Sequence, residues 1–195
     1  MILARHGESA FSVRGHCNGD ASACGGLTDG GREQARALGR ALGGERLDLA
    51  VHTEFRRTRE TAELALEGRS LAWLVVPELG DIAVGRYEGR HLDEYREWAW
   101  SAGPDDECPG GGESRTAAAR RFAAGFRRVL EREERTALVV AHGLPIRYAL
   151  DAAAGRVPSR RVEVVPYAQP FPLAAGALRE AVEQLEAWCA APAFA

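Results

Sequence analysis

The 195-residue sequence contains no lysine, so arginine supplies all 25 of its basic side chains, against 28 acidic ones. Without lysine, the chain can form neither a Schiff base nor a phosphate-binding loop that ends in Gly-Lys-Ser/Thr. The net charge of -3 argues against broad electrostatic binding to nucleic acid. A bound anion must therefore be held by arginine, histidine or backbone amides.

Cysteines and long apolar runs are also scarce. Cys17, Cys24, Cys108 and Cys189 lie far apart with no Cys-x-x-Cys pair, which predicts free thiols rather than a zinc or redox site. No apolar stretch approaches a membrane span, and the start Met-Ile-Leu-Ala-Arg leaves no room for a signal peptide. We therefore expect a cytoplasmic protein with no membrane or nucleic-acid partner, no cofactor and no metal.

Short apolar runs alternate with longer segments of helical periodicity. The runs predict strands at 2–4, 47–52, 70–76 and 137–141, and short outer strands at 162–165 and 167–173. Helices are predicted at 28–43, 56–67, 91–102, 114–132, 144–154 and 176–190. This order is typical of an α/β fold, a three-layer α/β/α sandwich around a mainly parallel sheet. We expect a single domain over 1–195, with a lid or specificity insert around 77–113, where the periodicity weakens.

Two predicted strands are followed by a His-Gly pair, His6-Gly7 and His142-Gly143. In an open parallel sheet the ligand crevice lies outside the carboxyl ends of the strands, so both imidazoles can face one pocket. A third strand end, His52, leads into a run of arginines over 56–59. Each feature also has a structural explanation, since a buried histidine can be satisfied locally and Arg56 with Glu60 has the spacing of a surface ion pair.

Six segments, in chain order over about 140 residues, carry a family resemblance. They are Arg5-His6-Gly7-Glu8-Ser9, Leu27-Thr28 with Gly31, Gln34 and Ala35, Thr53-Glu54-Phe55-Arg56-Arg57 with Thr61-Ala62, Leu79-Gly80-Asp81 with Gly85-Arg86-Tyr87-Glu88-Gly89, Pro109 to Ser114, and Val139-Val140-Ala141-His142-Gly143. In these segments the chain resembles the histidine phosphatase superfamily, the phosphoglycerate mutase-like proteins.

The resemblance implies a phosphoglycerate mutase-like fold and a metal-independent phosphatase that hydrolyses a small-molecule phosphomonoester. His6 would form a phosphohistidine, while Arg5, Arg57 and His142 surround the phosphoryl oxygens. Asp81, at a position where the family usually has glutamate, would be the general acid, with Glu88 as the nearby alternative. These five residues, His6, Asp81, Arg5, Arg57 and His142, are the expected catalytic set.

The expected substrate-binding residues are Arg5, Ser12, Asn18, Arg57, Glu88, His142 and Gly143. Two of these positions depart from the family pattern. Ser12 replaces an asparagine, and Gly15-His16-Cys17-Asn18-Gly19 replaces Gly-Arg-x-Gln-Gly, which removes an arginine and shortens an amide. These changes leave the phosphate site intact and the recognition of the leaving group open.

Other functions remain open. A mutase-type phosphotransferase needs a substantial closing lid, and this chain is shorter than the family's mutases, which favours a phosphatase. A catalytically weak regulatory protein that binds a phospho-ligand would explain Asp81, Ser12 and His16. A metal hydrolase based on His16, Cys17, Cys24 and His52 has no regular ligand spacing.

The aromatic side chains of the insert have two interpretations. Tyr87, Tyr95, Trp98 and Trp100 either form the core of the lid, which their helical spacing favours, or line a pocket for the leaving group. The physiological substrate stays open, and so does the oligomeric state, with a homodimer among the possibilities.

Overall fold

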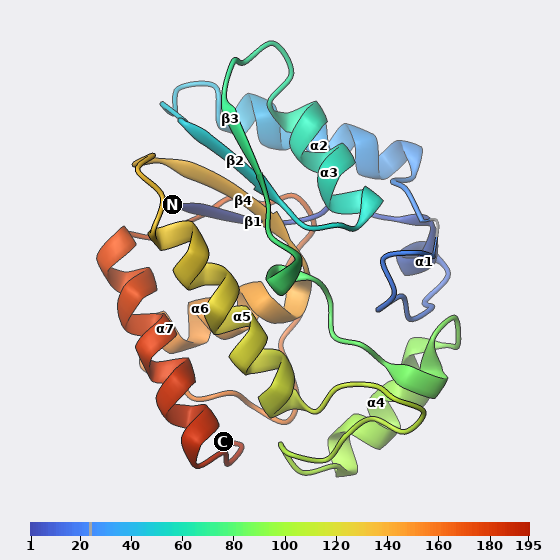
Figure 1. Cartoon of the computed structure of the whole chain (residues 1–195). Helices are drawn as coiled ribbons and strands as arrows, with labels where there is room; N and C mark the ends of the chain where they lie inside the picture. The colour runs from blue at the N-terminus through green and yellow to red at the C-terminus, as the bar shows by residue number, and fades with distance from the viewer. Residues whose placement is uncertain (24) are drawn as a thin grey trace.

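The central sheet has five strands in the order β3-β2-β4-β1-β5 (Figure 1). The structure is a computed structural model that describes residues 1–23 and 25–195. Its strands are β1 (Ile2–Arg5), β2 (Leu49–His52), β3 (Ala72–Val75), β4 (Ala137–Ala141) and β5 (Phe171–Pro172). β1 to β4 run parallel, and β5 pairs antiparallel with β1. The predicted mainly parallel sheet is confirmed.

Helices cover both faces of this sheet. α2 (Asp29–Ala41) and α3 (Arg56–Ala65) lie on one face, and α5 (Arg115–Leu130), α6 (Gly143–Ala153) and α7 (Ala175–Ala190) on the other. Successive strand residues point to opposite faces. Thus Leu49 and Val139 join the core with α5 to α7, whereas Ala50 and Val140 join the core with α2 and α3. The expected three-layer sandwich is confirmed.

Cap residues fix where the helices begin. Thr28 accepts a hydrogen bond from the Gly31 amide at 2.9 Å before α2, and Ser114 accepts one from Ala117 at 3.0 Å before α5. Both start points were predicted, because a side-chain oxygen before an amphipathic run satisfies a free N–H of the first turn.

The outer strands were predicted correctly only in part. Residues 162–165 form no strand, whereas within 167–173 the two-residue strand β5 and an isolated bridge from Tyr167 to Arg5 pair with β1. The carbonyl of Val165 accepts from Arg5 at 2.8 Å and that of Glu163 from Arg147 at 3.3 Å. Arginine side chains therefore bond to carbonyls of this segment, and neighbouring prolines lack the N–H that a ladder needs.

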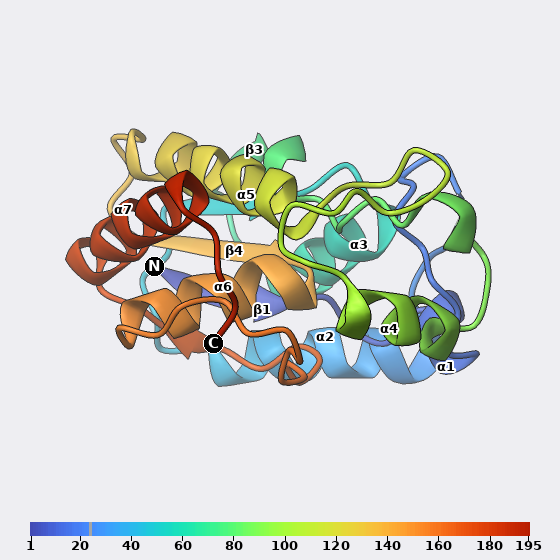
Figure 2. The same cartoon turned by 90° about the horizontal axis from the view of Figure 1, so that it is seen from below.

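The insert at 77–113 lies beyond the carboxyl ends of the parallel strands, beside the four-residue helix α1 (Ala10–Val13) (Figures 1 and 2). It contains the short helices η1 (Pro77–Leu79) and η2 (Gly85–Tyr87), followed by α4 (Leu92–Ser101). Within it Tyr87, Tyr95 and Trp98 have ring centroids 5.8 to 6.3 Å apart. These three rings pack together within the insert, whereas Trp100 is 41% exposed.

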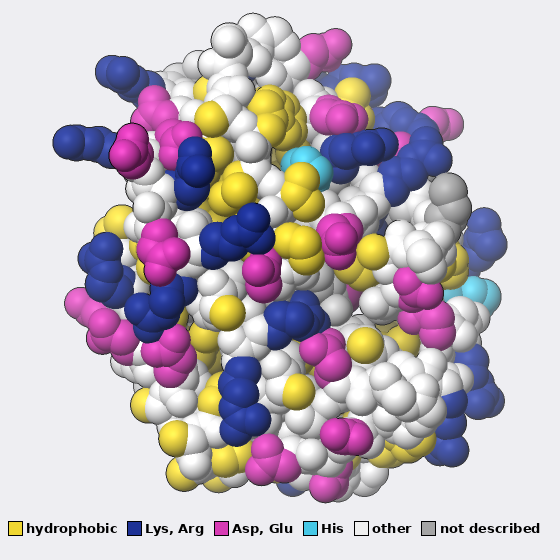
Figure 3. Space-filling model, in the orientation of Figure 1, with side chains coloured by type: hydrophobic (Ala, Val, Ile, Leu, Met, Phe, Trp, Pro, Cys, Tyr) yellow, Lys and Arg dark blue, Asp and Glu magenta, His cyan; other side chains and the backbone are white. Residues whose placement is uncertain are grey.

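Arginine and acidic side chains intermingle over the surface (Figure 3). Examples are Arg127 with Glu186 at 2.7 Å and Arg128 with Glu78 at 3.1 Å. Exposed pairs of this kind contribute about 1 kcal/mol or less each, so the two apolar cores carry most of the stability. No helix in the described chain is both long enough and apolar enough to cross a membrane.

Three cysteines, Cys17, Cys108 and Cys189, are buried free thiols, as predicted. Cys24 lies outside the described residues. Over residues 1–23 and 25–195, no group of three His, Cys, Asp or Glu side chains could hold a metal ion. In particular, His16, Cys17 and His52 form no such group.

Candidate active site

A cavity of about 500 Å³ opens at the carboxyl end of the sheet. Arg5 at the end of β1, His6 after it and Arg57 near the start of α3 line one part of it, and the insert lines another. Cavities of roughly 300 to 1,000 Å³ are typical of small-molecule sites. The cavity therefore has room for a phosphate and for the group attached to it.

His6 is 3% exposed and is held in one tautomer. Its Nδ1 lies 2.7 Å from the carbonyl oxygen of Gly7, which can only accept, so Nδ1 carries the hydrogen. The Nε of Arg57, which can only donate, lies 3.1 Å from Nε2 of His6. Both contacts place the lone pair of His6 on Nε2.

The environment of His6 favours the neutral ring. Burial lowers its pKa well below the ordinary value, and the charges of Arg57 and Arg5 lower it further, against the opposing hydrogen bond to Gly7. A neutral imidazole with a fixed lone pair is a nucleophile that needs no other base to activate it.

Close backbone packing fixes the loop that carries His6. A Cβ on Gly7 would lie 2.4 Å from the Gly31 carbonyl oxygen, and a Cβ on Gly31 would lie 2.0 Å from that of Glu8. The Thr28 hydroxyl donates to the Glu8 carboxylate at 2.7 Å, and the Glu8 amide donates to the Gln34 side chain at 2.8 Å. Residues 5–9 and 27–35, the first two segments of the family resemblance, thus hold the loop after β1 against the start of α2.

Arg57 is 3% exposed and connects the polar groups of the site. Besides its contact with His6, its Nη2 lies 3.2 Å from Oδ2 of Asp81 and 3.1 Å from Nδ1 of His142. It also donates to the side-chain oxygen of Asn18 and, at 3.0 Å, to the Asn18 carbonyl. The buried guanidinium is therefore held from several directions.

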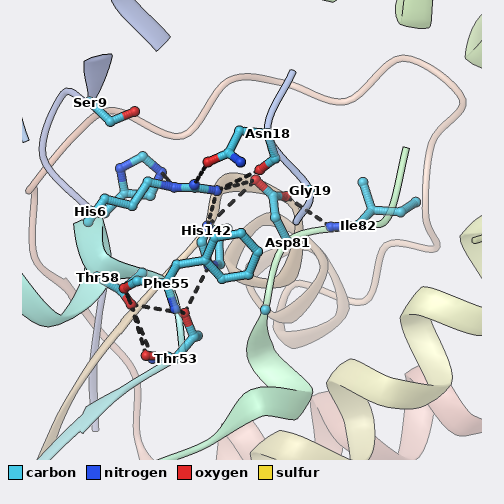
Figure 4. A network of polar contacts seen from close by, with 12 residues as sticks. His6, Ser9, Asn18, Gly19, Thr53, Phe55, Thr58, Asp81, Ile82 and His142 are labelled. Carbon is cyan, nitrogen blue, oxygen red and sulfur yellow. Dashed lines mark hydrogen bonds and ion pairs between the residues drawn. The ribbon is translucent and has the colours of Figure 1, made fainter. Parts of the chain in front are cut away.

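His142, just before α6, is fully buried behind Arg57. Its Nε2 is 3.0 Å from the Thr53 hydroxyl, which lies 2.9 Å from the Thr58 hydroxyl (Figure 4). Thr58 donates its hydrogen to the Phe55 carbonyl at 2.8 Å, so it accepts from Thr53, and Thr53 then accepts from His142.

These hydrogen bonds place the hydrogen of His142 on Nε2 and the lone pair on Nδ1, which faces Arg57. Burial, followed by the charges of Arg57 and of the other nearby cations, lowers the pKa of His142 well below its ordinary value. His142 is thus a neutral acceptor that orients Arg57.

The two candidate acids have different surroundings. Asp81 lines the cavity, with Oδ2 3.5 Å from Nδ1 of His142 as well as near Arg57. Glu88 is not among the cavity-lining residues, and its oxygens accept from Asn18 at 3.1 Å and from the Gly19 amide at 2.8 Å. The geometry favours Asp81 over Glu88, which braces the loop that carries Asn18.

The segment that carries Asp81 is fastened to α5. Arg121 donates to the carbonyls of Glu78, Gly80 and Asp81 at 2.9 to 3.0 Å, and to the Glu113 carboxylate at 2.6 Å. Glu113 also accepts from the Ala83 amide at 2.9 Å. No sequence pattern distinguishes Arg121 from the other 24 arginines.

Arg5 is the last residue of β1 and directly precedes His6. Its guanidinium carbon is 3.9 Å from the centre of the Tyr167 ring, and its Nη1 donates to the Val165 carbonyl. Its buried Nε has no hydrogen-bond partner among the described residues. Arg5 and Gly143 both line the cavity.

The structure therefore brings His6, Arg5, Arg57 and Asp81 to one cavity wall, with His142 behind them. Ser12 also lines the cavity, in α1, where its hydroxyl donates to the Ser9 carbonyl at 2.9 Å. Sequence reasoning missed Thr53 and Thr58 as the support of His142, although Thr53 opens the segment that contains Arg57.

Residues 1–168 match the family described as the histidine phosphatase superfamily, branch 1. The chain belongs to this superfamily. An adenosylcobalamin/alpha-ribazole phosphatase of Escherichia coli is 33% identical over 149 residues, 73% of this chain and 72% of that protein. The corresponding Salmonella typhimurium enzyme is 34% identical over 127 residues, and the match spans 62% of each chain.

Solved structures of the superfamily have the same fold. A putative alpha-ribazole-5'-P phosphatase of Escherichia coli has a TM-score of 0.70 at 30% identity, over 80% of this chain and 79% of that chain. A mycobacterial glucosyl-3-phosphoglycerate phosphatase has a TM-score of 0.70 at 25% identity, over 87% of this chain and 88% of that chain. The similar superfamily members include phosphatases named for different substrates, and the predicted phosphoglycerate mutase-like fold is confirmed.

Proposed function

We propose that this member of the superfamily is a metal-independent phosphatase, which hydrolyses a small-molecule phosphomonoester through a phosphohistidine on His6. The observation that carries the proposal is the buried, neutral His6, whose lone pair sits on Nε2 beside the guanidinium of Arg57. The names of the relatives refer to different phosphorylated compounds, so they support the reaction class without fixing the leaving group.

In the first step, Nε2 of His6 attacks phosphorus and the bond to the ester oxygen breaks. Arg57 turns its Nε–H from His6 to a phosphoryl oxygen, and the unpartnered Nε–H of Arg5 donates to another. These two positive charges balance the charge of the phosphoryl group during transfer. Asp81, in its protonated form, gives its proton to the departing alkoxide.

In the second step, water attacks the phosphohistidine. Asp81, now a carboxylate, takes a proton from this water, and Nε2 of His6 leaves with its lone pair restored. The products are inorganic phosphate and the free enzyme. The insert at 77–113 acts as the lid over the leaving group, because its helix α4 lines the same cavity as His6.

The test is hydrolysis of p-nitrophenyl phosphate in EDTA, together with detection of acid-labile phosphate on His6 in a quenched reaction. We expect turnover and labelling in the wild type and neither in His6→Ala. The matched control is His52→Ala, because His52 ends strand β2 and likewise donates Nδ1–H to the next carbonyl, at 2.7 Å, yet does not line the cavity.

Labelling that persists in His6→Ala contradicts the nucleophile assignment. A folded wild type that binds phosphate but releases no nitrophenol between pH 5 and 8 favours the phospho-ligand-binding regulatory protein instead.

A further inference from the structure

The cavity continues past His6 to a wall formed by α4 and the start of α5. Arg115 of α5 and Tyr95 of α4 both line it, and neither belongs to the phosphoryl-transfer machinery. Each has a buried polar atom without a hydrogen-bond partner among the described residues, Nε of Arg115 and the hydroxyl of Tyr95.

Arg115 is half-buried and has no carboxylate partner in the described part of the chain. Its Nη1 donates to the Tyr148 hydroxyl at 3.2 Å and its Nη2 to the Arg160 carbonyl at 3.4 Å. Both acceptors are neutral, and a guanidinium has five N–H donors. Partial burial of a cation without a counterion costs free energy of folding. The position of Arg115 in the cavity wall is therefore typical of a side chain that serves binding rather than stability.

Other arginines of the lid and its surroundings do have carboxylate partners. Examples are Arg90 with Glu94 at 2.5 Å, Arg96 with Asp93 at 3.1 Å, Arg121 with Glu113 at 2.6 Å and Arg147 with Glu163 at 3.1 Å. The chain thus supplies carboxylates near the cavity but none to Arg115.

Tyr95 is 8% exposed, and burial raises the pKa of its hydroxyl, which therefore remains a donor at any physiological pH. Tyr95 and Arg115 line the same cavity. By contrast, the hydroxyl of neighbouring Tyr87 accepts from Arg86 at 3.2 Å. Two donors without protein acceptors therefore share one wall of the cavity.

A second cation, Arg161, lines the same cavity, with its guanidinium carbon 4.7 Å from the centre of the Trp100 ring. No carboxylate pairs with Arg161 within residues 1–23 and 25–195. The cavity lining therefore includes Arg115 and Arg161 without carboxylate partners among the described residues, alongside Glu163, whose carboxylate pairs with Arg147.

We infer that Arg115 and Tyr95 bind a second anionic group, carried by the leaving group of the substrate. The inference rests on the proposed function: with the phosphoryl group at His6 and Arg57, the alcohol extends towards α4 and places its anion on the remote wall. The substrate class is then a phosphomonoester of an alcohol that also bears a carboxylate or a second phosphate. Small adjustments of Tyr95 and Arg115 bring their buried donors onto this anion.

Binding of phosphonates tests the inference without turnover, because their carbon–phosphorus bond is not hydrolysed. By calorimetry, linear ω-carboxyalkyl phosphonates of increasing length are compared with ω-hydroxyalkyl phosphonates, and with α,ω-bisphosphonates for the second-phosphate case. At one or more lengths we expect the doubly anionic ligand to bind about tenfold or more tightly, as for one charge-assisted hydrogen bond.

Arg115→Met and Tyr95→Phe should each reduce this preference and leave the affinity for the hydroxyalkyl phosphonates within about twofold. The matched controls are Arg120→Met, since Arg120 of the same helix donates to the Cys189 carbonyl at 2.9 Å, and Tyr87→Phe. Both controls should keep the full preference, because neither side chain lines the cavity.

The inference is overturned if the wild type shows no preference at any length for either anion, or if both cavity variants retain it. Hydrolysis of p-nitrophenyl phosphate separates this failure from that of the proposed function. An enzyme that hydrolyses it but ignores the second anion is a phosphatase without the subsite, and a protein that binds the doubly anionic phosphonates without hydrolysis has the subsite without the activity.

Discussion

Replacing Thr53 by valine removes one hydroxyl from the core of the site at nearly constant volume. The hydroxyl accepts the Nε2–H of His142 at 3.0 Å, and the histidine is fully buried, so no water can replace it. A buried donor left without a partner costs about 1 to 3 kcal/mol. We therefore expect Thr53→Val to lower the free energy of unfolding by about that amount.

The same substitution releases the tautomer of His142. If the hydrogen moves to Nδ1 to escape the apolar valine, it points at Nη2 of Arg57, 3.1 Å away, where two donors repel each other. Arg57 then loses its position beside His6 and Asp81, and kcat falls along with stability. Thr53→Ser should restore both.

Urea unfolding measures the stability, the ¹⁵N shifts of the His142 ring report the tautomer, and p-nitrophenyl phosphate turnover reports Arg57. Thr116→Val is the matched control, because Thr116 is equally buried and donates to the Pro104 carbonyl at 2.9 Å, remote from the histidines. It should cost less, since its own amide still donates to that carbonyl, and should leave the ring shifts unchanged. The reasoning is refuted if Thr53→Val keeps the wild-type ¹⁵N shifts of the His142 ring and a free energy of unfolding within about 0.5 kcal/mol of the wild-type value.

Three further predictions concern the acid, the histidines and the packing of the His6 loop. Asp81→Asn should slow alkyl phosphates by about 10² to 10⁴ and p-nitrophenyl phosphate far less, because a good leaving group needs little protonation; equal losses would shift the acid role to Glu88. Burial and the nearby arginines lower the pKa of His6, so below about pH 6.5 its imidazole is protonated in the unfolded chain but stays neutral in the folded chain. The free energy of unfolding should therefore fall as the pH falls, by up to about 1.4 kcal/mol per pH unit for this residue. The same dependence of the free energy of unfolding on pH in His6→Asn as in the wild type contradicts this assignment. Gly31→Ala would place a Cβ 2.0 Å from the Glu8 carbonyl and should lower Tm, whereas Gly30→Ala, with nothing nearer than 3.7 Å, should be neutral or stabilising; similar melting of the two variants removes the packing argument.

Local patterns sufficed for most of the fold and for part of the site. The helix starts at Thr28 and Ser114 could be predicted because a helix cap is a local hydrogen bond, from a backbone amide three residues ahead to the side-chain oxygen. The segment at 162–165 has a strand-like composition, yet its carbonyls bind arginines from β1 and α6, a long-range competition that composition does not reveal.

The sequence alone determined that an anion site must be built from arginine and histidine, because lysine is absent, and the two His-Gly pairs located it at the ends of β1 and β4. Only the tertiary structure decided how the roles divide. His6 keeps its lone pair towards the cavity because a carbonyl holds its other nitrogen, whereas His142 lies behind Arg57 because hydroxyls of Thr53 and Thr58 fix its ring. Hydrogen-bond direction depends on which groups meet in space. His142 is 85 positions from Arg57 and 89 positions from Thr53 in the sequence, so these groups meet only in the folded chain.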